Sequence, residues 1–123
     1  MNPWLAVAAL AAFGTFALHT VAGTWSLVPP LLQSRVPWVP RLTHYYCWHL
    51  VTQMLLVMAC GLAYAAVFPG GADVGWVVTL LAWGSCLWSL GLNAAWRPKH
   101  WSDLPQWVLF LAIAGPATVG LIR

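Results

Sequence analysis

Residues 43–67 read THYYCWHLVTQMLLVMACGLAYAAV, a stretch of 25 residues without a Lys, Arg, Asp or Glu. A bilayer core about 30 Å thick needs roughly 20 apolar residues in helical form, so this segment is long enough to cross it. The apolar residues show no period-two alternation, which excludes a strand of a transmembrane barrel. The stretch therefore predicts a transmembrane helix, and its His, Tyr, Thr and Gln side chains make it the most polar of the candidate spans.

Three further segments have the same apolar character, namely residues 4–22, 74–96 and 104–122. Short connections separate the last three spans, so we expect these neighbours to be antiparallel. The connection over residues 23–42 is longer and mixes Pro, Trp, Leu and Arg, and it is expected to lie along the membrane surface. The sequence thus predicts a single domain over residues 1–123: an all-α, antiparallel four-helix transmembrane bundle with a longer interfacial loop between helices 1 and 2.

The composition excludes several classes of protein. Only 6% of the 123 residues are charged, 62% are hydrophobic, and the mean hydropathy is +0.79. A soluble domain carries about 25% charged residues, so a soluble enzyme is excluded. Five Lys and Arg spread along the chain do not form a nucleic-acid-binding stripe. The chain has no Glu, its two Asp lie in loops, and no catalytic motif is present, which favours a protein that is not an enzyme.

The distribution of basic residues predicts the orientation in the membrane. The first and third connections carry Arg35, Arg41, Arg97 and Lys99, whereas the opposite side has only Arg123. The positive-inside rule then places loops 23–42 and 97–103 in the cytoplasm and both termini outside. Most of the ten Trp residues fall near the ends of the spans, where aromatic belts form at the two membrane surfaces.

Polar side chains within the spans gather toward the cytoplasmic half of the predicted bundle. His19 and Asn93 lie near the inner ends of their spans, and Gln106 lies near the inner start of the fourth. Polar groups in a membrane usually face the bundle interior, so the polar arc of the second span is expected to turn toward them. The candidate ligand-binding cluster therefore consists of His19, Tyr45, His49, Gln53, Asn93 and Gln106, with His19 and His49 in a common pocket walled by all four helices.

This cluster admits several functions. The first is a self-associating or accessory membrane subunit that is not an enzyme. In such a protein the cluster would pack the helices through hydrogen bonds or bind a small hydrophobic ligand. Alternatively, His19 and His49 would bind haem b or a transition metal, since two imidazoles on adjacent spans can ligate one iron. A small oligomeric transporter is the third possibility. In outline the chain resembles small four-span proteins of bacterial inner membranes, including accessory subunits of larger complexes, which implies that localisation. The expected partners are lipids, further copies of the chain or a larger membrane complex, and not nucleic acid.

Overall fold

A computed structural model of the chain describes residues 1–100 and 103–123. The described residues form helices and connections without a strand. In chain order the elements are α1 (Pro3–Ser26), α2 (Val28–Leu32), α3 (Trp38–Val67), the 3-10 helix η1 (Pro69–Gly71), α4 (Ala72–Trp96) and α5 (Gln106–Ile122).

Three helical segments are long and apolar enough to cross a membrane: Pro3–Ser26, Trp38–Val67 and Pro69–Trp96. The prediction of an all-helical fold is therefore confirmed for the described residues, and three of its helices are compatible with an integral membrane protein. The helix α5 is also apolar, but it has 17 residues and is shorter than the other three. Its role as a fourth span stays a prediction.

The connection between the first two spans is much more helical than expected. The helix α1 continues to Ser26, α2 follows directly, and α3 begins at Trp38 rather than near residue 43. Proline is tolerated in the first turn of a helix, because the backbone N–H groups there have no hydrogen-bond partner within the helix. Pro29 lies in the first turn of α2 and Pro37 is the N-cap of α3, so these prolines begin helices. Of the predicted loop 97–103, residues 101–102 lie outside the described part.

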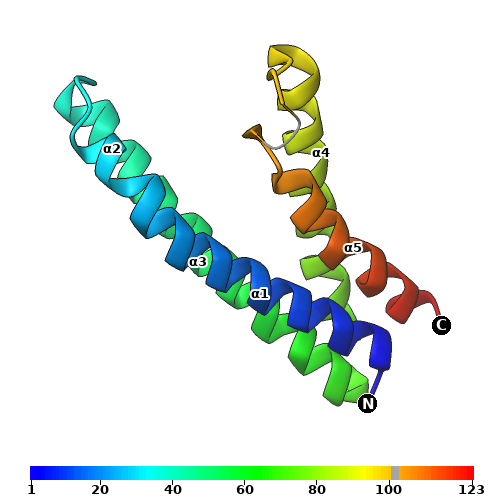
Figure 1. The fold of residues 1–123 in the computed structure, drawn as a ribbon. Helices are drawn as coiled ribbons and strands as arrows, with labels where there is room; N and C mark the ends of the chain where they lie inside the picture. The colour runs from blue at the N-terminus through cyan, green and yellow to red at the C-terminus, as the bar shows by residue number, and fades with distance from the viewer. Residues whose placement is uncertain (101–102) are drawn as a thin grey trace.

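The helices are arranged as two arms of a V rather than as a bundle packed along its whole length (Figure 1). The first arm consists of α1, α2 and α3, and the second arm consists of α4 and α5. The arms meet at the end that carries both termini and η1, which we call the vertex, and they diverge toward the opposite end (Figure 1).

The buried core lies mainly in the half of the molecule near the vertex. Small side chains dominate it and allow the helix backbones to approach closely, as is usual between helices in membranes. Its fully or nearly fully buried members include Ala8, Ala12, Ala59, Leu62, Ala82, Ala114 and Ala117. A four-helix bundle packed along its whole length is therefore not confirmed, because this small-residue core joins the arms near the vertex only (Figure 1).

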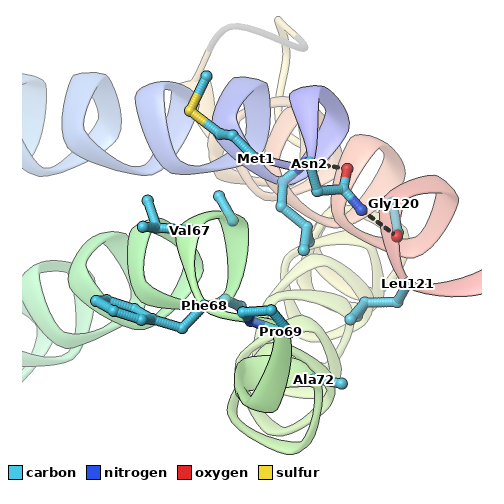
Figure 2. A pocket seen from close by; sticks show the side chains of 11 residues that line it. Met1, Asn2, Val67, Phe68, Pro69, Ala72, Gly120 and Leu121 are labelled. Atoms are coloured by element: carbon cyan, nitrogen blue, oxygen red, sulfur yellow. Dashed lines mark hydrogen bonds between the residues drawn. The ribbon is translucent and has the colours of Figure 1, made fainter.

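One residue connects three helices at the vertex. The backbone N–H of Asn2 donates to the carbonyl of Ala66 at 2.8 Å, and its side-chain amide donates to the carbonyl of Gly120 at 2.6 Å (Figure 2). The side-chain oxygen of Asn2 also caps α1 by accepting from the N–H groups of Trp4 and Leu5. These bonds fix the start of α1 against the ends of α3 and α5.

Candidate functional site

The space between the diverging arms forms a cleft. Two adjoining cavities of about 410 and 430 Å³ share five lining residues, so we treat them as one site and call it the inter-arm cleft. Each volume is in the range of small-molecule pockets, which is about 300–1,000 Å³. The long helices α1, α3, α4 and α5 all contribute. The shared residues are His19, Leu27, Val51, Gln106 and Phe110.

His19 is held in the cleft by contacts between α1 and α3. Its Nε2 lies 3.3 Å from the carbonyl oxygen of Trp48, and its ring stacks on the Trp48 indole with centroids 4.8 Å apart. A carbonyl only accepts, so Nε2 must carry the proton in this bond, and an uncharged ring then has Nδ1 as a free acceptor position. The indole fits here because Gly23 has no side chain: a Cβ at Gly23 would lie 3.1 Å from Trp48 Nε1.

Ser89 contributes a buried hydroxyl from α4. It lines the cleft, its residue is only 6% exposed, and its Oγ has no hydrogen-bond partner among the described residues. Buried polar groups are normally paired, so an added hydrogen-bond partner at this hydroxyl would stabilise the structure. Ser89 is not among the site residues predicted from the sequence, although it lies one helical turn before Asn93 and on the same face.

Asn93 and Gln106 have different roles. The side-chain amide of Asn93 donates to the carbonyls of Ser89 at 2.8 Å and Leu104 at 3.1 Å, so it ties α4 to the segment that precedes α5. Asn93 therefore supports the cleft from outside it. Gln106 is the first residue of α5 and lines both cavities with His19. The structure thus brings together two of the predicted site residues, with Asn93 beside them.

The remaining predicted residues do not reach the cleft. His49 and Gln53 are exposed, and Tyr45 is half-buried with its ring edge-on to His49 at 4.6 Å. The buried face of α3 includes Leu55, Ala59 and Leu62. At 100° per residue, His49 lies about 120° and Gln53 about 160° around the helix from Leu55. The expected common pocket for His19 and His49 is therefore not formed, because the polar arc of α3 faces away from the core.

The arrangement gives no support to haem or metal binding by His19 and His49. The His19 ring stacks on the Trp48 indole, whereas the His49 ring lies edge-on to it with the ring centroids 5.1 Å apart. Of the two histidines, His19 lines the cleft and His49 does not. Axial ligation of one iron requires both rings to face it. Over residues 1–100 and 103–123, no group of three or more His, Cys, Asp or Glu is placed to hold a metal ion.

The cleft is suited to an uncharged molecule. Its walls are mainly apolar. The uncharged polar groups are the His19 imidazole, the Gln106 amide and the Ser89 hydroxyl, together with three hydroxyls that already donate to carbonyls of their own helices, those of Thr15, Ser26 and Ser85. Among the described residues, the charged side chain that lines the cleft is that of Asp103, which is exposed and accepts from the backbone N–H of His100 at 3.1 Å; its carboxylate disfavours an anionic ligand.

Comparisons of the chain with known protein families, with curated proteins and with solved structures find no match. Function is therefore inferred from the cleft and from the exposed surface of the helices.

Proposed function

We propose that this chain is a non-enzymatic, four-span integral membrane protein whose inter-arm cleft binds an uncharged amphiphile with a hydroxyl-bearing head group. The 17 residues of α5 extend about 25 Å, which is close to the thickness of the hydrocarbon core. In this proposal α5 is the fourth span, both termini lie outside, and loops 23–42 and 97–103 face the cytoplasm of a bacterial inner membrane.

The unpaired hydroxyl of Ser89 is the observation that carries this proposal. A buried polar group without a partner costs about 1–3 kcal/mol, and rotation of the enclosed Ser89 hydroxyl toward the cleft would let a ligand hydroxyl remove that cost. His19 and Gln106 lie in the same cleft and offer further hydrogen bonds to the same head group. Apolar residues such as Val51, Met54 and Phe110 would contact the apolar body of the ligand.

The arms leave the cleft accessible from the lipid phase. Trp88 is 76% exposed and nevertheless lines the cleft, so its indole lies at the edge between the cavity and the surroundings. A lipid-like ligand would therefore enter sideways from the bilayer and leave its acyl chains among the other lipids. This route distinguishes the site from a water-filled channel.

The proposal is tested with a diacylglycerol that carries a photoreactive diazirine, added to the protein in liposomes. After illumination, adducts are mapped by mass spectrometry, and we expect them on the cleft-lining parts of the four long helices. Val51→Trp fills the cleft and should abolish this labelling. Val21→Trp is the matched control, because Val21 is exposed on α1 and is not among the cleft-lining residues. Equal labelling of the two variants would contradict the proposal.

Ser89→Ala tests the head-group contact. Loss of one hydrogen bond of about 1 kcal/mol should weaken binding of the probe about fivefold. Thr43→Val is the control, because Thr43 is exposed on α3, is not among the cleft-lining residues, and its hydroxyl donates to the carbonyl of Val39 at 2.9 Å. It should bind the probe as the unmodified protein does, and a similar loss in both variants would show that the Ser89 hydroxyl makes no special contact.

A further inference from the structure

The side of α3 that faces away from the core carries a continuous exposed stripe with residues three or four positions apart. This spacing keeps side chains on one face of a helix and is typical of a helix-packing seam. We call this face the α3 outer stripe. Its exposed members are Tyr46, His49, Gln53, Val57, Cys60 and Tyr64.

The polar centre of this stripe lies deep in the membrane. The 30 residues of α3 extend about 45 Å, whereas the hydrocarbon core is about 30 Å thick. If α3 spans this core, its midpoint lies within about 7.5 Å of the bilayer centre. Gln53 is next to the midpoint, and His49 is one turn away. Both side chains are therefore within the hydrocarbon in every such placement.

A single copy of the chain does not satisfy these two side chains. Among the described residues, neither the Gln53 amide nor the His49 imidazole makes a side-chain hydrogen bond, and the His49 ring lies edge-on to the rings of Tyr45 and Trp48. Lipid tails offer no hydrogen-bond partner, so polar side chains in a span normally face other protein. The stripe thus requires a partner that has donors and acceptors at the same depth.

We infer that a second copy of this chain covers the α3 outer stripe, with the two α3 helices packed in parallel. All copies insert with the same orientation, so a twofold axis along the membrane normal places each residue opposite its own counterpart. The stripe is chemically suited to this, because an amide and an uncharged imidazole each donate and accept. Gln53 of one copy then pairs with Gln53 of the other. The stripe has no Lys, Arg, Asp or Glu that would repel its counterpart.

This dimer leaves the inter-arm cleft free. The cleft uses Val51 and Leu55 of α3, whereas the stripe lies on the opposite side of the same helix. Self-association therefore does not depend on the proposed ligand, and the two proposals can fail separately.

Cysteine cross-linking in native membranes tests this inference, because the chain has a cysteine on the stripe and a control on the same helix. Cys60 and Cys47 are both exposed, but they lie about 140° apart around α3. Two double variants are compared, each with a single cysteine. The variant Cys47→Ser/Cys86→Ala retains Cys60 on the stripe, and the variant Cys60→Ser/Cys86→Ala retains Cys47 away from it. With copper–phenanthroline and oxygen, the protein that retains Cys60 should form a disulfide-linked dimer and the other should not. Cross-linking through Cys47 alone, or of Cys60 to a different protein, would overturn the inference.

A second measurement does not depend on cysteine reactivity. Gln53→Leu removes the central hydrogen bonds and should raise the dimer dissociation constant in liposomes about tenfold, measured by energy transfer between labelled copies at varied protein-to-lipid ratios. Gln33→Leu is the matched control, because Gln33 lies in the connection between α2 and α3. An unmodified protein that stays monomeric at every ratio, or a Gln53→Leu variant that associates normally, would also overturn the inference. Photolabelling of the cleft in Gln53→Leu should be unchanged.

Discussion

Gly120 determines how closely α5 approaches α1 at the vertex. A Cβ at this position would lie 2.9 Å from Leu5 Cγ and 3.1 Å from the backbone nitrogen of Leu5. The latter contact is with backbone, so a rotamer change cannot relieve it. The same glycine carries the carbonyl that accepts from the side chain of Asn2. Its small size therefore permits both the close packing and the hydrogen bond.

Gly120→Ala should destabilise the protein by about 1–3 kcal/mol, which is typical of an overpacked core position. Gly84→Ala is the control, because a Cβ at Gly84 meets no atom within 4 Å. That variant should be neutral or up to about 1 kcal/mol more stable, since Ala favours a helix over Gly. Denaturant unfolding of the purified proteins in detergent measures both values, and an equal response of the two variants would show that Gly120 is not tightly packed.

At the scale of the helix, sequence alone predicted the four long helices, but it predicted neither α2 nor which side of α3 faces inward. A helical wheel gives the angle between two side chains, such as Gln53 and Leu55, but it does not say which one faces a neighbour. We assumed that polar side chains turn inward. In α3 the small and apolar residues Ala59 and Leu62 form the contact instead, because they allow closer packing. The structure brings His19 and Gln106 into the same cleft, and the sequence also predicts both at the same end of their spans.

The two helices of the second arm are joined by a hydrogen bond between side chains. Trp83 Nε1 of α4 donates to Thr118 Oγ1 of α5 at 3.0 Å, and Thr118 in turn donates to the carbonyl of Ala114. A double-mutant cycle with Trp83→Phe and Thr118→Val should give a coupling energy of about 0.6 kcal/mol, and at most about 1.7 kcal/mol. Unfolding free energies of the four proteins provide the measurement. Strictly additive effects would mean that this bond does not hold the arm together.

At the scale of the whole molecule, the positions of the charged residues agree with the V-shaped fold. Arg35, Arg41, Arg97 and Lys99 belong to segments at the open ends of the arms, whereas Arg123 lies over the Trp4 ring at 5.6 Å near the vertex. Nothing in the amino-acid sequence indicates that the arms diverge, because divergence depends on where small residues from four separate helices meet. The inter-arm cleft therefore could not be predicted from the amino-acid sequence.

The proposed topology requires residue 99 and residue 123 to lie on opposite sides of the membrane, since α5 separates them. In a Cys47→Ser/Cys60→Ser/Cys86→Ala background, Arg123→Cys should react with a membrane-impermeant maleimide in intact spheroplasts. Lys99→Cys should react only after the membrane is permeabilised, because the four basic residues hold that end in the cytoplasm. The comparison also tests whether the 17 residues of α5 cross the bilayer. If α5 lay on the surface, both cysteines would react from the same side, and the chain would have three spans with its termini on opposite sides.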